Sequence, residues 1–353
     1  MQNSSIRSSS PLIVPRAVCA LLLALMLQAP AHAQTDTVVN LYTARHYQTD
    51  EALYTNFTKK TGIRVNKIEA GEDALLERVR SEGRNSPADV FLTVDAGRLW
   101  RAEQLELFAP VKSPVLDARI PAQLRTPAGT WFGFSTRARV IAFNRKTVKP
   151  AEVANYEDLA DPRFKGRICI RASNHVYNLS LMSSMIERLG EAKAEQWARG
   201  VVANLARDPR GGDTDQLRGV AAGECDVAVV NTYYYVRLMK SDRPEDRQLV
   251  ERVAIAFPNQ STSGTHVNVS GGGVLRTAPN PKAARLFLEY LASDEAQIYF
   301  ADGNNEWPAV TSAVARNPEL ASLGMFKTET VNIGVLGRNQ ALAQKIFDRV
   351  GWK

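Results

Sequence analysis

The chain has 353 residues, of which 44% are hydrophobic and 23% are charged. This length predicts two domains, and the composition excludes a disordered chain, a collagen-like repeat and a small disulfide scaffold. The net charge of +7 would by itself suggest a nucleic-acid partner. Basic residues are interleaved with acidic ones and form no cluster of four or more, so we expect no binding of nucleic acid.

The first 33 residues have the pattern of a secretory signal peptide. Arg7 and Arg16 provide a basic start, Ala17–Leu27 is an apolar run, and Ala31-His32-Ala33 has the small residues of a cleavage site. The apolar run is shorter than the roughly 20 residues that cross a bilayer, which argues against a retained anchor. We therefore expect residues 1–33 to be removed on export to the periplasm.

Three cysteines occur, and Cys19 would leave with the signal peptide. Cys169 and Cys225 remain in an oxidising compartment, where a disulfide and two buried free thiols are both reasonable. Their spacing does not resemble that of a thiolate metal site.

Strands alternate with amphipathic helices along the chain, which predicts an α/β fold with a parallel sheet covered on both faces. Trp131–Asn144 reads as one long strand that could cross from one domain to the other, and Gly271-Gly272-Gly273 predicts either close backbone approach or a bend near the hinge. The other strands are expected at 38–44, 63–70, 88–94, 167–172, 226–230, 253–257 and 266–276. Helices are expected after each of the first three strands and at 178–189, 192–205, 213–223, 281–292, 294–300 and 340–350.

Ligands of open α/β sheets bind beyond the carboxyl ends of the strands, so the residues that follow the strands are the candidates for a site. Five of the ten tyrosines lie at three such ends, within Arg45-His46-Tyr47, Ser173–Tyr177 and Asn231–Tyr235. Phenolate oxygen is a hard anionic ligand that suits Fe(III). Alternatively, neutral tyrosine rings stack on sugars or cations, or simply pack the domain interface.

These segments resemble those of periplasmic ferric-iron-binding proteins, the substrate-binding components of ABC iron importers of the Fbp/Fut type, in their tyrosine-rich class. The motifs that carry the resemblance are LYTARHYQTD (41–50), ADVFLT (88–93), the segment 131–144, SNHVYN (173–178) and NTYY (231–234). The resemblance implies a two-domain, type II (Venus-flytrap) fold with hinge-crossing strands and an interdomain cleft. We assign 34–138 with 264–312 to the N-terminal domain, and 139–263 with 313–353 to the C-terminal domain.

In that family one Fe(III) is held in the cleft, and the protein delivers it to an ABC permease of the inner membrane. The resemblance carries the ligand roles to Tyr233, Tyr234, Tyr177, Tyr47 and His46. For His46 the alternative is a residue that donates a hydrogen bond to a ligand without touching the iron. Tyr235 matches no ligand and is expected to pack. Some relatives place a carboxylate where this chain has Val94, and we expect the neighbouring Asp95 to cap the helix that follows. We also expect a monomer that carries ferric ion or a ferric chelate.

A synergistic, carbonate-like anion is a further expectation from the resemblance, with Arg137 near it. Arg137 and Arg139 lie on one face of the long strand and could receive such an anion, or could instead form interdomain ion pairs. Ser173 and Asn174 precede a helix start and could donate hydrogen bonds to it.

No catalytic motif of the HExxH, GxxxxGK or GxSxG type occurs, so we expect a binding protein and not an enzyme. The alternative is a binding protein of the same fold for another solute, namely a polyamine, thiamine or an oxyanion. A polyamine or thiamine would require carboxylates in the cleft, and the strand-end segments are poor in them.

Overall fold

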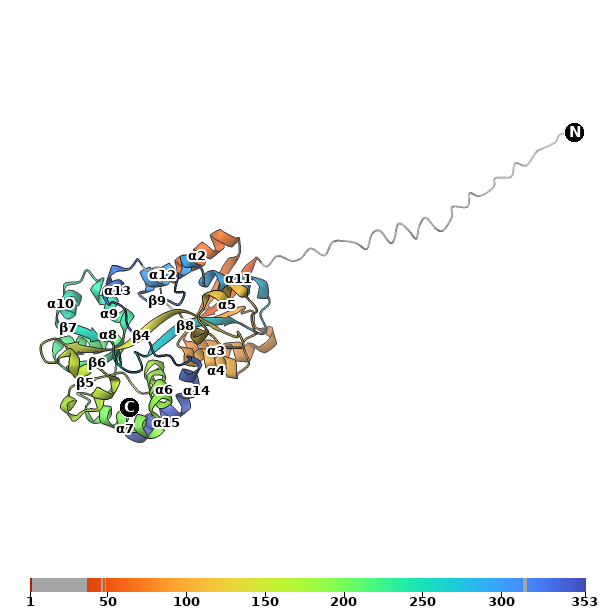
Figure 1. The fold of residues 1–353 in the computed structure, drawn as a ribbon. Helices are drawn as coiled ribbons and strands as arrows, with labels where there is room; N and C mark the ends of the chain where they lie inside the picture. Colours follow the sequence, from red (N-terminus) through yellow and green to blue (C-terminus); the bar gives the residue numbers. More distant parts are fainter. Residues whose placement is uncertain (2–36, 46, 48, 314–315) are drawn as a thin grey trace. The chain divides into compact units, whose positions relative to one another are not determined.

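The computed structural model describes residues 1, 37–45, 47, 49–313 and 316–353 (Figure 1). The predicted signal peptide and the predicted ligand His46 lie outside the described residues. All helices and strands below belong to the compact unit Asp36–Lys353. No helix within the described part of the chain combines the length and the apolar character that a membrane span requires.

The N-terminal part forms the predicted βαβαβ unit. Strand β1 (Val38–Thr43) pairs in parallel with β2 (Arg64–Glu69) on one side and with β3 (Val90–Val94) on the other. Every residue of β3 is buried, as expected of a central strand whose two faces are covered. Helices α2 (Asp50–Thr61) and α3 (Glu72–Glu82) connect the three strands, and α4 (Ala96–Gln104) follows β3.

Strand β4 (Phe132–Asn144) is the predicted long strand, and it belongs to two sheets. Residues 132–138 pair with β8 (Val267–Val274), which in turn pairs with β3, whereas residues 139–143 pair with β6 (Val227–Asn231). The partner of β4 therefore changes between Ala138 and Arg139. Figure 1 shows β4 and β8 in the middle, with α2, α3 and α11 on one side and α8, α9 and α10 on the other.

The three glycines of β8 allow the close approach that the sequence predicts. A Cβ atom on Gly271 would lie 2.4 Å from the Phe132 carbonyl oxygen, and one on Gly273 would lie 2.3 Å from the Thr130 carbonyl oxygen. Both distances are too short for a side chain, so these positions accept only glycine without a shift of the neighbouring strand.

The second sheet is completed by β5 (Ile168–Cys169), parallel to β6, and β7 (Val253–Ala256), antiparallel to β4. We expected a strand over 167–172, but β5 has two residues because the chain leaves β6 there and turns into helix α6 (Val176–Leu189). A disulfide joins Cys169 to Cys225. The sequence left open whether these residues form a disulfide or stay as buried free thiols, and the structure has the disulfide.

Strand β9 (Trp307–Pro308) pairs antiparallel with β4 in the first sheet. The remaining helices are α5 (Pro114–Arg119), α7 (Glu191–Ala203), α8 (Asp213–Ala222), α9 (Thr232–Met239), α10 (Pro244–Arg252), α11 (Pro281–Leu291), α12 (Asp294–Asn304), α13 (Pro318–Ser322), α14 (Gly334–Arg338) and α15 (Gln340–Val350). Short 3₁₀ turns lie at Gly83–Asn85, Ala122–Leu124, Pro150–Val153, Tyr156–Ala160 and Pro162–Phe164.

Two lobes follow from the buried apolar clusters. The cluster around the first sheet, here called the first lobe, includes Phe91, Phe134 and Phe287, whereas the second lobe is built on clusters around β6 that include Val229 and Val230. The C-terminal segment contributes to both. Ile333 and Leu336 pack in the first lobe, and Ile346 and Phe347 pack in the second. The domain boundaries given above stay a prediction.

Candidate metal site

A cavity of about 520 Å³ lies between the two lobes. The first lobe lines it with residues that follow β1 and β3 and residues at the end of α12, and the second with residues at the starts of α6 and α9. Its lining residues are Tyr47, Thr49, Val94, Arg98, Arg171, His175, Val176, Tyr177, Tyr233, Tyr234, Arg237, Gly303, Asn304 and Asn305. No Asp or Glu is among the described residues of this lining.

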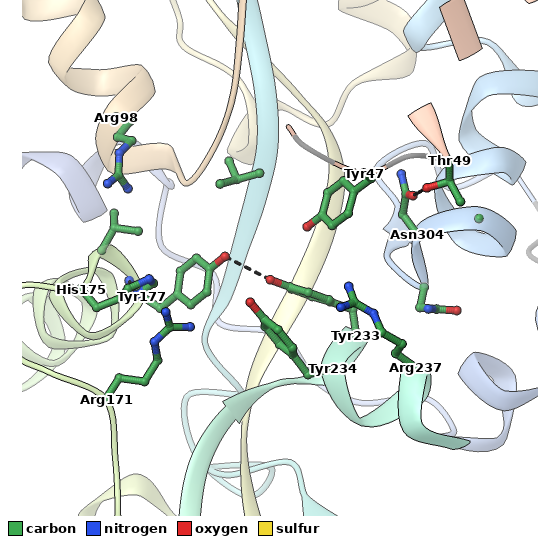
Figure 2. Close-up of a pocket in the computed structure, with 14 residues that line it drawn as sticks. Tyr47, Thr49, Arg98, Arg171, His175, Tyr177, Tyr233, Tyr234, Arg237 and Asn304 are labelled. Carbon is green, nitrogen blue, oxygen red and sulfur yellow. Dashed lines mark hydrogen bonds between the residues drawn. The ribbon is translucent and has the colours of Figure 1, made fainter. Parts of the chain in front are cut away.

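Four of the predicted tyrosine ligands come together in this cavity. The hydroxyl oxygens of Tyr177 and Tyr233 lie 3.0 Å apart, and the ring centroid of Tyr234 lies 4.2 Å from that of Tyr233. Tyr47 reaches them from the first lobe, with its ring centroid 6.3 Å from that of Tyr233 in an edge-on arrangement. Figure 2 shows the four hydroxyl groups pointing toward one another across the cavity.

Local sequence places the second-lobe tyrosines at helix starts. Strand β6 is entirely buried and runs directly into α9, so Tyr233 and Tyr234 fall in its first turn. His175 caps α6 by accepting a hydrogen bond from the Tyr177 N–H through Nδ1 at 3.3 Å, which places Tyr177 in the first turn of that helix. Helix N-termini stabilise negative charge, so both positions favour a phenolate over a neutral phenol.

Arginines surround the tyrosine rings. The Cζ atom of Arg171 lies 5.3 Å from the ring centroid of Tyr177, and that of Arg237 lies 5.5 Å from the ring centroid of Tyr234. On the first-lobe side, Arg45 Cζ lies 4.9 Å from the ring centroid of Tyr47. These distances are those of cation–π contacts.

Burial opposes ionisation of the tyrosines while no metal is bound. It raises the pKa values of Tyr177 and Tyr233 well above 10, and mutual repulsion with neighbouring tyrosines adds to this, while Arg137 lowers both. Burial likewise raises the pKa of Tyr47, with Glu306 adding to the rise. Burial and then Arg171 lower the pKa of His175 to about 3, so this imidazole is neutral at neutral pH. A metal bound here must displace phenolic protons.

The predicted anion-binding residues have different surroundings. Arg137 is buried, and its Nη1 donates to Ser270 Oγ at 2.9 Å, whereas its Nε and Nη2 have no hydrogen-bond partner among the described residues. Arg139 Nη1 donates to Asp213 Oδ2 at 2.7 Å, which makes an ion pair within the second lobe and not one between the lobes. Both Cζ atoms lie within 6 Å of the Tyr177 ring centroid, at 5.9 and 5.6 Å, so the two arginines share a face as expected.

Ser173 and Asn174 are not among the residues that line the cavity. The Ser173 N–H donates to the carbonyl oxygen of Lys353 at 2.9 Å, and Asn174 is exposed. Tyr235 packs in the second lobe as predicted, and its hydroxyl donates to the Val253 carbonyl oxygen at 2.9 Å.

Val94 lines the cavity with an alkyl side chain, as its position predicts. Asp95 caps α4, also as predicted, because its Oδ1 accepts a hydrogen bond from the Gly97 N–H at 2.7 Å.

Sequence reasoning missed several residues that line the cavity. Arg237 follows Tyr233 by four positions, which is the spacing of neighbours on one helix face, so helical periodicity could have identified it. Arg171 lies two positions before the strand-end segment Ser173–Tyr177. No comparable sequence pattern identifies the other lining residues Arg98, Thr49, Asn304 and Asn305. Asn304 and Thr49 are 255 positions apart in the sequence, and folding brings their side chains within hydrogen-bonding distance.

Residues 85–328 match the family model described as bacterial extracellular solute-binding protein. Iron uptake protein A2 of Synechocystis sp. is 52% identical over 325 residues, covering 92% of each chain. The Fe(3+)-binding periplasmic protein of Serratia marcescens is 28% identical, covering 82% of this chain and 84% of that protein. The structure of Trichodesmium FutA (IdiA) in complex with iron and citrate has a TM-score of 0.87 and 52% identity, covering 90% of this chain and all of that one. The chain therefore belongs to the bacterial extracellular solute-binding proteins, and within them to the periplasmic ferric-iron-binding family of ABC iron transporters.

Proposed function

We propose that this protein captures Fe(III) in the periplasm through the phenolate oxygens of Tyr47, Tyr177, Tyr233 and Tyr234 and delivers it to an ABC permease. The observation that carries the proposal is the convergence of four tyrosine hydroxyls from three separate segments in one cavity. The names of the related iron uptake and ferric-binding proteins point to the same cargo. His46, next to Tyr47, is a further proposed ligand on the grounds of the sequence resemblance.

The chemistry of the lining suits a hard trivalent cation. Four phenolates would exceed the charge of Fe(III) by one, and the arginines of the lining, Arg98, Arg171 and Arg237, offset that excess. Within the described residues no three His, Cys, Asp or Glu side chains lie close enough together to hold a metal. The proposed site draws on tyrosine oxygens, which are hard donors, as carboxylate oxygens are, and harder than imidazole or thiolate.

A carbonate-like or carboxylate anion that completes the iron shell is a further part of the proposal. Arg137 is the best supported of the residues considered, since Nε and Nη2 of its buried guanidinium have no described hydrogen-bond partner. Arg139 donates hydrogen bonds to Asp213, Asn231 and Asn178, so fewer of its N–H groups remain for an anion. The related Trichodesmium structure holds citrate together with iron. A ferric chelate is therefore a reasonable form of the cargo for this chain.

A cationic solute fits this cavity poorly. Polyamines and thiamine would meet arginines and no carboxylate among the described lining residues. An oxyanion alone would be attracted to the arginines, but it would leave the clustered phenols without a role. We propose that the protein acts as a monomer whose two lobes close on the cargo.

Metal analysis of the exported protein, purified without chelators, tests the proposal. We expect about one iron per chain and a reddish colour from charge transfer between phenolate and Fe(III). Protein stripped of iron should regain the colour when ferric citrate is added. A colourless protein that takes up no iron from ferric citrate would contradict the proposal, and binding of phosphate or spermidine instead would favour the alternatives.

A further inference from the structure

Helix α6 carries a buried polar face that the proposed iron chemistry does not use. Tyr177, Ser180 and Ser184 are spaced by three and four residues, so they lie on one side of the helix. The other side, with Leu181, Met182 and Met185, packs in the core of the second lobe. Ser180 and Ser184 are nevertheless fully buried. Buried hydroxyls lower stability unless they are hydrogen-bonded, so their partners matter.

The partner of Ser180 comes from the other lobe. Ser180 Oγ lies 2.9 and 2.8 Å from the two carboxylate oxygens of Asp95, at the end of β3 in the first lobe. The hydroxyl is the donor, since a carboxylate only accepts. Hydrogen bonds to an ionised group are the stronger class, and both side chains are fully buried.

Asp95 is itself rigidly held. Its carboxylate also accepts from the Gly97 N–H at 2.7 Å and from Asn268 Nδ2, on strand β8, at 2.7 Å. Its backbone φ is +92°, a region that residues with a side chain rarely adopt. Such a conformation persists only where the surroundings impose it, and it occurs preferentially at sites with a mechanical or chemical role.

The contact lies next to the proposed iron site. Val94 and Val176, which line the cavity, directly precede Asp95 and Tyr177 in the chain. The hydrogen bond between Ser180 and Asp95 therefore joins the first lobe to the first turns of the helix that presents Tyr177. Because the bond is polar, it can be exchanged for water when the lobes separate, at a lower cost than an apolar contact.

We propose that the Asp95–Ser180 hydrogen bond is an interlobe latch, which positions Tyr177 against the first lobe and favours the closed cleft. This rests on the proposed function only for its effect on iron. The latch itself concerns the apo protein and can be tested without metal. Ser180 and Asp95 are thus positioning residues, and neither is proposed to touch the ion.

The chain offers a matched control for the test. Ser183 lies on the same helix and is also fully buried, but its Oγ donates to the Leu179 carbonyl oxygen at 2.7 Å, within α6. Ser180→Ala and Ser183→Ala therefore delete the same buried hydroxyl from the same helix. Only the first breaks a bond between the lobes. A general loss of helix stability would lower the melting temperature in both variants.

The experiment measures interlobe distances in the apo protein by electron spin resonance, with spin labels at the exposed positions Lys60 and Arg199. We expect Ser180→Ala to shift the distance distribution toward longer values, and to raise the Kd for ferric iron by about tenfold. Ser183→Ala should leave both unchanged. Asp95→Ala, which leaves the Ser180 hydroxyl without its acceptor, should reproduce the shift, and adding Ser180→Ala to Asp95→Ala should change the distances little.

Distances for Ser180→Ala that match those for Ser183→Ala would overturn the latch, whatever the iron affinity. Additive effects of Asp95→Ala and Ser180→Ala would overturn it as well, because the two residues would then act independently. If the wild-type protein bound no iron, the proposed function would fail, and the apo distances would still decide on the latch.

Discussion

The two lobes contribute to the cavity in different ways. The second lobe supplies three tyrosines, of which Tyr177 and Tyr233 are hydrogen-bonded to each other without any help from the first lobe. The first lobe supplies Tyr47, which meets this group only across the cleft. We infer that the second lobe is a preformed receptor and that Tyr47 joins it when the cleft closes, so that cargo binding selects the closed form.

The largest effect should come from the second lobe. Tyr233→Phe combined with Tyr234→Phe removes two hydroxyls and keeps both rings in place. We expect the colour to be lost and iron affinity to fall by far more than the roughly 100-fold that loss of an outer-shell partner costs. Absorbance and competition with citrate would measure this. Tyr235→Phe is the control, because the Tyr235 hydroxyl donates to Val253 and should not affect iron. A double variant that stays coloured would contradict the preformed receptor.

The pH dependence should also distinguish the lobes. Burial raises the pKa values of Tyr177 and Tyr233 well above 10 in the apo protein, so these phenols are protonated at neutral pH and must release protons to iron. Iron affinity should therefore decrease as pH falls, by about tenfold per pH unit for each proton released.

If Tyr47 also ligates as phenolate, Tyr47→Phe should reduce that slope by one proton. Titration of iron affinity between pH 6 and 8, a range of about two units around neutrality, measures both slopes. Equal slopes in the wild type and the variant would exclude Tyr47 phenolate from the iron shell.

The effect of Tyr47→Phe on affinity should be smaller than that of the second-lobe double variant. We expect a loss of roughly 10–100-fold, with colour retained, since the three second-lobe tyrosines remain. Stopped-flow release of iron to a chelator would show faster dissociation. Tyr54→Phe is the control within the first lobe, because Tyr54 is buried there and does not line the cavity. A complete loss of colour in Tyr47→Phe would reverse the roles of the two lobes.

Much of this arrangement could be predicted from the sequence because the information is local. Alternation of strands and helices predicts the first sheet, and the rule that ligands bind at strand ends led to Tyr177, Tyr233 and Tyr234. The long strand 132–144 was also recognisable, since neither a proline nor a cluster of turn residues interrupts it. That these tyrosines ligate iron stays a prediction.

The missed features depend on contacts between distant segments. Asp95 was expected to cap α4, but nothing in the sequence shows that Ser180, 85 positions later, also donates to it. The lining residues Asn304, the last of α12, and Asn305, directly after it, reach the cavity because that helix packs in the first lobe. The cysteines could not be assigned for the same reason, since their pairing depends on β5 lying beside β6.

The disulfide provides the smallest expected effect on iron and a further test of the difference between the lobes. It joins Cys169 in β5 to Cys225, which lies two residues before β6, and these two strands lead to Tyr177 and to Tyr233. For a separation of 56 residues, Cys169→Ser with Cys225→Ser should lower the free energy of unfolding by about 4 kcal/mol. Iron affinity should change by less than about tenfold, because the cap of α6 and the β6–α9 junction still place the tyrosines.

Denaturant unfolding and iron competition on the same variant separate the two quantities. Cys→Ser at Cys169 alone is a poor comparison because it leaves Cys225 free to react, so the control is the double variant Cys169→Ala/Cys225→Ala, which removes the link without adding hydroxyls. If either double variant lost as much iron affinity as Tyr47→Phe, the second-lobe tyrosines would owe their arrangement to the cross-link. The second lobe would then hold its three tyrosines in place only while the disulfide is formed. In that case their arrangement without the first lobe would depend on export to an oxidising compartment.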